Sequence, residues 1–90
     1  MKFTNPRGTR DFLPEEMIKR QFVIDKIKKV FEQWGFDPID TPAFEYWRML
    51  SAKSGEDVKN EIYYFKDKGT RELGLRFDLT VPLARVVVNT

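Results

Sequence analysis

Residues 72–78, near the C-terminal end of the sequence, alternate between polar and apolar side chains and are the residues best suited to chemistry. In an extended strand, alternate side chains point to opposite faces, so the two kinds separate. The polar face holds Glu72, Gly74, Arg76 and Asp78, and the apolar face holds Leu73, Leu75 and Phe77. We expect the apolar face to join a core. The polar face is either the solvated side of an antiparallel sheet or a charged floor where Gly74 lets a ligand approach the backbone closely.

The 90 residues contain no histidine and no cysteine, and this excludes several classes of chemistry. The chain therefore cannot contain a Ser-His-Asp triad, a cysteine nucleophile, a disulfide framework, or a metal site made of thiolate or imidazole ligands. The sequence also contains no phosphate-binding loop, no metal-ligand cluster and no isolated pair of acids. It therefore predicts a small α+β domain with no metal site and with one polar strand face as its candidate site.

A β-hairpin is expected to position the polar strand. Residues 62–66 and 72–78 have the composition of strands, and residues 67–70 form the turn between them, with Gly69 in the left-handed conformation. Thr80 is expected to act as the N-cap of the helix that follows. The segments before the hairpin are expected to be extended at 36–42, helical at 44–52 and a loop at 54–57.

A long helix is predicted from Pro14 to about Gln33, after an irregular arm over residues 1–13. Proline suits the first helical position, and Gly35 suits the left-handed residue that ends a helix. At about 100° per residue, the helix presents one broad apolar arc that is expected to pack on the protein's own core. The arc consists of Met17, Val23, Ile24, Ile27, Val30, Phe31 and Trp34.

Ile18 and Phe22 fall outside that arc, one turn apart and among charged residues. They are either surface hydrophobes of the kind that folded proteins tolerate, or a second apolar strip. In the second interpretation, the helix packs on its own core with one side and on a partner with the other.

Length and charge limit the number of domains, the location and the kinds of partner that the sequence allows. Ninety residues suffice for one small domain. The longest apolar run, residues 62–65, is far shorter than the ~20 residues of a membrane helix, and the N-terminus lacks the apolar core of a signal peptide, so a cytoplasmic protein is expected. Residues 1–30 carry eight basic and four acidic side chains, which suits either a polyanionic partner or a solvated helix face.

Residues 7–14 (RGTRDFLP) resemble the opening of histidyl-tRNA synthetases. Residues 34–36 (WGF) with 41–45 (TPAFE) resemble motif 1 of class II aminoacyl-tRNA synthetases, the class to which that family belongs. The match continues through KSGED at 53–57, YFKD at 64–67 and LRFDLTVPLAR at 75–85. The FDLT version of the last motif resembles the archaeal and eukaryotic branch.

The resemblance implies the N-terminal part of a class II catalytic domain over residues 1–90, with part of its antiparallel sheet, a long motif 1 helix and a β-hairpin. The matching enzyme is a histidine–tRNA ligase, which activates histidine with ATP and Mg²⁺ and transfers it to tRNA(His). Motif 2, motif 3 and the anticodon domain would follow Thr90. The chain alone is therefore expected to be inactive, to hold no catalytic residue and to bind no cofactor, and the whole enzyme to be a cytoplasmic homodimer.

By the same resemblance, Asp78, Leu79 and Thr80 belong to the histidine pocket. Asp78 would supply negative charge to the α-ammonium group and Thr80 a hydroxyl acceptor, while Leu79 would contribute backbone or packing contacts. The alternative for Asp78 is an ion pair with Arg76 or Arg85. The alternative for Thr80 is the capping role, which is compatible with binding.

Motif 1 of class II synthetases is mainly a dimer element, so the resemblance implies that Ile18, Phe22 and Pro42 lie in a dimer interface. An ordinary proline at the start of a strand is the alternative for Pro42.

Two other functions stay open. A synthetase-like regulatory subunit of ATP phosphoribosyltransferase, in histidine biosynthesis, shares the fold and the amino-acid pocket but charges no tRNA. A stand-alone dimerisation module would bind no ligand, and titration with histidine would separate it from the other two.

Overall fold

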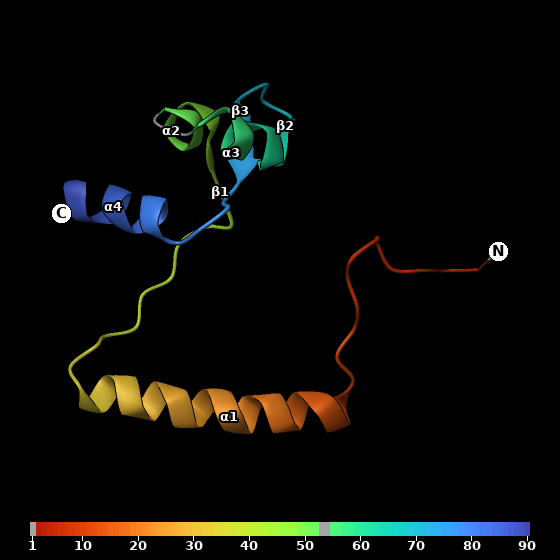
Figure 1. Ribbon diagram of the computed structural model, residues 1–90, viewed down its shortest axis with the longest axis vertical. Helices are drawn as coiled ribbons and strands as arrows, with labels where there is room; N and C mark the ends of the chain where they lie inside the picture. The colour runs from red at the N-terminus through yellow and green to blue at the C-terminus, as the bar shows by residue number, and fades with distance from the viewer. Residues whose placement is uncertain (1, 53–54) are drawn as a thin grey trace. The chain divides into compact units, whose positions relative to one another are not determined.

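The computed structural model describes residues 2–52 and 55–90, and the chain divides into two compact units between Ile39 and Asp40. The elements are α1 (Pro14–Gln33), β1 (Phe44–Tyr46), α2 (Trp47–Ser51), α3 (Glu56–Glu61), β2 (Tyr64–Lys66), β3 (Glu72–Leu75) and α4 (Thr80–Val88) (Figure 1). None of the helices within these described ranges is long and apolar enough to span a membrane.

Helix α1 begins and ends where the sequence predicts. Pro14 occupies its first turn, and Gly35 follows it with a φ of +87°. The N–H of Gly35 donates to the carbonyl of Glu32 at 3.1 Å, and the N–H of Phe36 donates to that of Phe31 at 3.0 Å. The rings of Phe31 and Phe36 meet edge to face with centroids 5.9 Å apart. This is a Schellman ending with its apolar contact.

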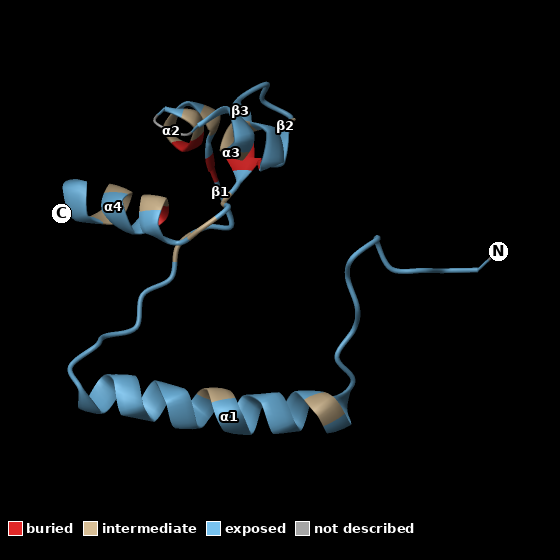
Figure 2. Ribbon diagram, in the orientation of Figure 1, coloured by how far each residue is buried: buried red, intermediate tan, exposed pale blue. Residues whose placement is uncertain are grey.

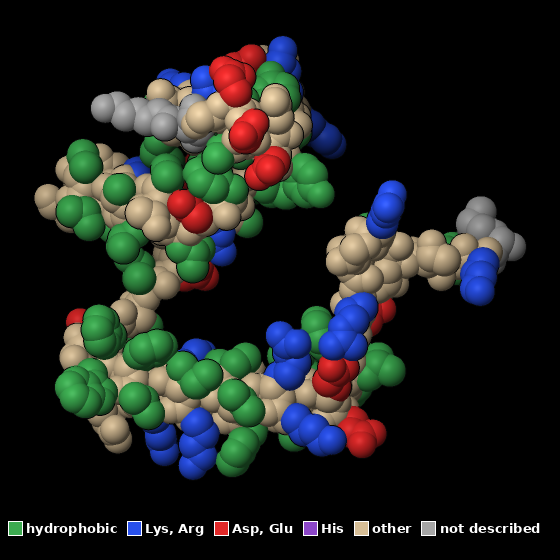
Figure 3. All heavy atoms as spheres, in the orientation of Figure 1, with side chains coloured by type: hydrophobic (Ala, Val, Ile, Leu, Met, Phe, Trp, Pro, Cys, Tyr) green, Lys and Arg blue, Asp and Glu red, His purple; other side chains and the backbone are tan. Residues whose placement is uncertain are grey.

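No residue of α1 is buried (Figure 2). Phe31, on the predicted apolar arc, is 55% exposed, and Ile18 and Phe22 are 69% and 64% exposed. Figure 3 shows hydrophobic side chains along the surface of this helix. The prediction that the arc packs on a core is not met in the N-terminal unit, because its described residues contain no second helix or strand to cover α1.

The C-terminal unit contains an antiparallel sheet in the order β1-β3-β2. The predicted hairpin is confirmed as β2 and β3, although both strands are shorter than expected. Glu45 of β1 lies opposite Gly74 of the central strand, and Tyr64 of β2 lies opposite Gly74 from the other side. These three residues therefore share one face of the sheet.

The hairpin turn differs from its prediction in the residue that takes the left-handed conformation. Thr70 has a φ of +63°, whereas Gly69 is not among the residues with positive φ. The N–H of Thr70 donates to the Asp67 carbonyl at 3.0 Å, and the N–H of Asp67 donates to the Arg71 carbonyl at 3.1 Å. The chain thus turns over residues 67–70, and the last residue of the turn, Thr70, takes the left-handed conformation. Hairpins in which a left-handed residue follows a type I turn have the same geometry.

The core lies partly on the face that the sequence pattern marked as polar. Leu50, Ile62 and Leu73 are its buried apolar residues. A Cβ on Gly74 would lie 3.0 Å from Leu50 Cδ1 and 3.1 Å from Ile62 Cγ2. The close approach that Gly74 permits is therefore made by the protein's own side chains. On the opposite face Leu75 is 39% exposed, so the expectation of one apolar core face is only partly met.

Two local predictions upstream of the hairpin are corrected. The helix expected over 44–52 is divided into β1 and α2, because residues 44–46 pair with β3. Within the loop expected over 54–57, Glu56 and Asp57 instead begin α3, and Ser54 lies outside the described residues. Pairing with a distant strand overrides local preference in the first case.

Candidate functional site

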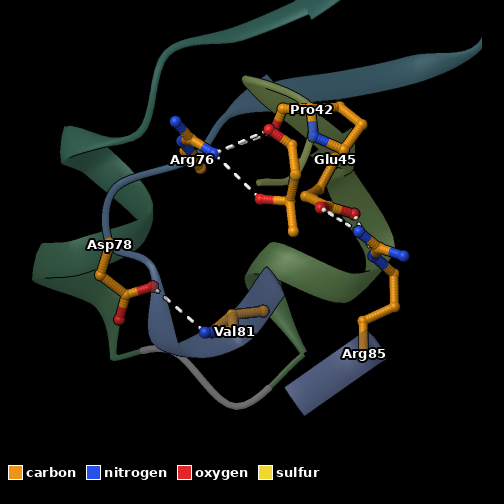
Figure 4. A network of polar contacts seen from close by, with 7 residues as sticks. Pro42, Glu45, Arg76, Asp78, Val81 and Arg85 are labelled. Carbon is orange, nitrogen blue, oxygen red and sulfur yellow. Dashed lines mark hydrogen bonds and ion pairs between the residues drawn. The ribbon is translucent and has the colours of Figure 1, made fainter. Parts of the chain in front are cut away.

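Residues 76–80, here called the pocket segment, connect the central strand β3 to helix α4. Asp78 is half-buried in this segment, and its Oδ1 accepts the N–H of Val81 at 3.3 Å (Figure 4). Thr80 is already the first helical residue, and Leu79 is the N-cap residue of α4 without a side-chain capping bond. The prediction that Thr80 caps α4 is therefore wrong. The Asp78 carboxylate, one residue before Leu79, accepts an N–H group that the first turn of the helix leaves without a helical partner.

Arg76 does not pair with Asp78. Its Nη1 donates to Thr41 Oγ1 at 2.9 Å, to the Thr41 carbonyl at 3.0 Å and to the Pro42 carbonyl at 3.3 Å. The N–H of Arg76 also donates to the Ala43 carbonyl at 2.9 Å, which extends the pairing between β1 and β3 beyond the strands themselves. The first residue of the pocket segment is thus fixed to residues 41–43.

Arg85 forms a two-point ion pair with Glu45. Its Nε donates to Oε1 at 2.9 Å and its Nη2 donates to Oε2 at 3.2 Å (Figure 4). The Glu45 side chain is only 7% exposed and that of Arg85 is 31% exposed. Because Glu45 lies in β1 and Arg85 in α4, the pair fixes the helix that follows the pocket segment to the sheet.

Both arginines that the sequence offered as partners of Asp78 are therefore bound to residues 41–45 instead. Among the residues that the structure describes, the hydrogen bond to Val81 is the one polar contact of the Asp78 side chain. The arrangement leaves a half-buried carboxylate with one oxygen in a fixed hydrogen bond and without a cation of the described chain. Such a group is suited to a ligand that carries a positive charge and several N–H donors.

The two other residues predicted for the pocket adjoin Asp78. Leu79 is 66% exposed, and Thr80 is exposed at the first position of α4. Phe77 and Val81, which flank the three residues, line an apolar hollow of about 360 Å³. The other residues of its lining are Met49, Leu50, Ala52, Gly55 and Val58.

The residues predicted for a dimer interface are all exposed, and they fall in both units. Ile18 and Phe22 lie on α1 in the N-terminal unit, and Pro42 precedes β1 in the C-terminal unit. The Lys26 Nζ lies 5.4 Å from the centroid of the Phe22 ring. The Pro42 carbonyl accepts a hydrogen bond from Arg76, a role that sequence reasoning did not predict.

Among the described residues, the two titratable groups with shifted pKa values lie at the hairpin, outside the pocket segment. The N–H and guanidinium of Arg71, with the N–H of Gly69, hold the pKa of the Asp67 carboxyl below its ordinary value. Burial raises the pKa of the Tyr64 hydroxyl, and its 3.0 Å hydrogen bond to Glu72 raises that pKa further. The contacts of Asp67 lie in the turn, whereas the Tyr64–Glu72 bond joins β2 to β3.

Comparison with known proteins supports the family resemblance directly. The profile of the family "Histidyl-tRNA synthetase" matches residues 8–90. The histidine–tRNA ligase of the archaeon Methanocaldococcus jannaschii is 49% identical over 87 residues, which are 97% of this chain and 21% of that enzyme. The chain belongs to the histidyl-tRNA synthetase family, and it spans about a fifth of the length of the curated relatives it matches.

Solved structures agree with this assignment. Histidyl-tRNA synthetase from Nostoc sp. PCC 7120 superposes with a TM-score of 0.81 at 35% identity, over 99% of this chain and 20% of that one. An ATP phosphoribosyltransferase regulatory subunit/histidyl-tRNA synthetase from Bacillus halodurans C superposes with a TM-score of 0.82 at 32% identity, over 96% and 22%. The predicted α+β fold with part of the synthetase sheet is thereby confirmed.

Proposed function

We propose that this chain is the N-terminal part of the catalytic domain of a histidine–tRNA ligase, ahead of motif 2. The whole protein activates histidine with ATP and transfers it to tRNA(His), and it works as a homodimer in the cytoplasm. The family assignment and the fifth of the relatives' length that the chain spans support this proposal. The 90 residues alone form no adenylate, because the ATP-binding arginine of motif 2 lies outside them.

The chemistry of activation requires positioning more than reactive side chains. The histidine carboxylate attacks the α-phosphate of ATP, so the protein must orient the two substrates and stabilise charge. A chain without histidine and cysteine is compatible with that task. No group of three acidic, histidine or cysteine side chains among the described residues could hold the Mg²⁺ ion, and we assign no step of the reaction to this metal.

The observation that carries the proposal is the polar environment of Asp78. The neighbouring cations Arg76 and Arg85 are bound to Thr41 and Glu45, which leaves the Asp78 carboxylate without a cation of the described chain. We infer that Asp78 receives the α-ammonium group of histidine and that Thr80 offers its hydroxyl oxygen beside it. Leu79 supplies backbone or packing contacts between them.

The test is Asp78→Asn in the whole protein. The side-chain oxygen of asparagine can accept the Val81 N–H as the aspartate oxygen does, so α4 keeps this contact while the negative charge is lost. Loss of a charge-assisted hydrogen bond predicts a fall of roughly ten- to a hundredfold in kcat/KM for histidine, with the KM for ATP little changed. Unfolding temperatures close to those of wild type would confirm that the fold is intact. Normal histidine kinetics, or a defect confined to ATP, would contradict the assignment.

One comparison favours a second candidate, a regulatory subunit of ATP phosphoribosyltransferase. The Bacillus halodurans C protein carries that function in its name beside histidyl-tRNA synthetase. Such a subunit binds histidine without charging tRNA. Attachment of histidine to tRNA(His) by the whole protein would exclude it, and histidine binding without any charging would favour it.

A further inference from the structure

Residues 76–85 are held to residues 41–45 on both sides of Asp78. Arg76 fixes the beginning of this stretch through Thr41 and Pro42, and Arg85 fixes α4 through Glu45 (Figure 4). The two contacts bridge sequence separations of 35 and 40 residues. Asp78 is therefore placed by contacts that reach far beyond its own loop.

The burial of Glu45 indicates that its ion pair with Arg85 has a role other than stabilising the fold. Its side chain is 7% exposed, and removing two charges from water costs much of what their attraction returns. An apolar pair of similar volume would hold α4 to β1 about as well. The two-point geometry instead fixes the direction of the Arg85 guanidinium, which points toward Glu45 and away from Asp78 in Figure 4.

Without Glu45, the Arg85 guanidinium would be a free cation on the helix whose first turn Asp78 contacts. Arginine carries its charge at every pH of interest, and it binds carboxylates through two parallel hydrogen bonds. A released Arg85 would thus compete for the Asp78 carboxylate with any cationic ligand. Arg76 is excluded from the same competition by its bonds to Thr41 and Pro42.

We propose that Glu45 is a positioning residue for the amino-acid site: by binding Arg85 it keeps the Asp78 carboxylate available to the α-ammonium group of the substrate. This inference rests on the proposed function of Asp78. Glu45 touches no substrate in this account and acts through Arg85. The family resemblance implied for residues 41–45 a part in a dimer element, whereas the contacts made by Glu45 connect the same residues to the amino-acid site.

The experiment compares variants of the whole protein in histidine-dependent ATP–pyrophosphate exchange. Glu45→Gln keeps the shape of the side chain but removes the charge and one of the two acceptors that bind Arg85. The KM for histidine should therefore rise about tenfold while the KM for ATP stays near that of wild type. Glu56→Gln is the matched control, because Glu56 is 85% exposed and, within the described part of the chain, its ion pair is with Lys59 of its own helix, at 3.9 Å. It should leave both KM values unchanged.

A second variant separates competition from a general loss of structure. Glu45→Gln/Arg85→Met lacks the Arg85 guanidinium, while Arg76 keeps its bonds to Thr41 and Pro42. Uncharged partners can replace a buried ion pair without loss of the fold. It should bring the KM for histidine back to within about threefold of wild type. Persistence of the tenfold defect in a folded double variant would overturn the inference, as would a normal KM for histidine in Glu45→Gln.

Asp78→Asn distinguishes failure of this inference from failure of the proposed function. If Asp78→Asn impairs histidine activation and Glu45→Gln does not, only the role of Glu45 is wrong. If Asp78→Asn itself is normal, the site assignment fails. In the double variant Asp78→Asn/Glu45→Gln, the histidine defect should equal that of Asp78→Asn alone, because Glu45 acts through Asp78. A further additive loss would contradict that route.

Discussion

At the scale of single residues, carboxylates in this chain have tasks that follow from their partners. Asp67 accepts the N–H groups of Gly69 and Arg71 at 2.9 Å and the Arg71 Nε at 2.7 Å. Asp78 accepts one N–H and pairs with no arginine of the described chain. The first carboxylate organises a turn, and the second has hydrogen-bonding capacity left for a ligand.

The contacts of Asp67 predict a pH dependence of stability. The folded pKa of this carboxyl lies below its ordinary value of 3.8, so the folded state favours the charged form. Its contribution is fully present above the ordinary value and is lost as the pH falls from there through the lower folded pKa. Thermal unfolding of wild type and Asp67→Asn should differ at neutral pH and converge in strong acid. A difference that persists or grows at low pH would show that the charge is not responsible.

At the scale of elements, other parts of the protein pack directly against Gly74 on one face of the sheet. A Cβ at this position would lie 3.0 Å from Leu50, 3.1 Å from Ile62 and 3.2 Å from the carbonyl oxygen of Tyr63. The carbonyl belongs to the backbone and cannot move aside cheaply. The central strand therefore requires glycine here for packing.

Gly74→Ala should destabilise the whole protein by about 1–3 kcal/mol, the usual cost of overfilling a packed core. Chemical unfolding would measure it. Gly55→Ala is the matched control, because nothing lies within 4 Å of the Cβ that it would add. An equal effect of the two substitutions would mean that backbone freedom, and not the contacts of Gly74, determines the result.

Helix α1 exposes its apolar residues, and we propose that Ile18 and Phe22, with Pro42, contribute to a homodimer interface. Ile18→Glu/Phe22→Glu would place two carboxylates among them, so sedimentation equilibrium of the whole protein should shift toward monomer. Gln21→Glu/Gln33→Glu adds the same charge on the same helix and should leave association unchanged. Undiminished association of the first variant, or a monomeric wild type at high concentration, would place the interface elsewhere.

The sequence predicts the elements whose signals are local. Pro14 and Gly35 are enough to predict the bounds of α1, because helix ends depend on the nearest few residues. The left-handed conformation of Thr70 could not be predicted, because the strand register decides which residue of the turn adopts it. The Glu45–Arg85 pair joins residues 40 apart, and no spacing rule connects them until the sheet brings β1 beside β3.

The candidate site, too, could be predicted from the sequence only in part. The family motif at 75–85 led to Asp78, Leu79 and Thr80, and their assignment to a histidine pocket remains a prediction. Sequence reasoning missed Glu45 as an ion-pair partner, although a lone carboxylate opposite a glycine in a neighbouring strand would have been a usable signal once the register was known.

At the scale of the whole molecule, the chain corresponds to one part of the longer proteins that it matches. It belongs to the histidyl-tRNA synthetase family and spans about a fifth of the length of its curated relatives. The part described here contains a carboxylate kept apart from neighbouring arginines, together with the contacts that place it. We propose that this carboxylate serves the activation of histidine.

The most direct test is ATP–pyrophosphate exchange by the whole protein, with each of the standard amino acids supplied in turn. Exchange reports adenylate formation itself, without requiring tRNA. We predict exchange with histidine and only background exchange with the other amino acids, including the similarly sized glutamine and asparagine. Exchange driven by another amino acid, or no exchange with histidine in a folded protein that binds ATP, would contradict it.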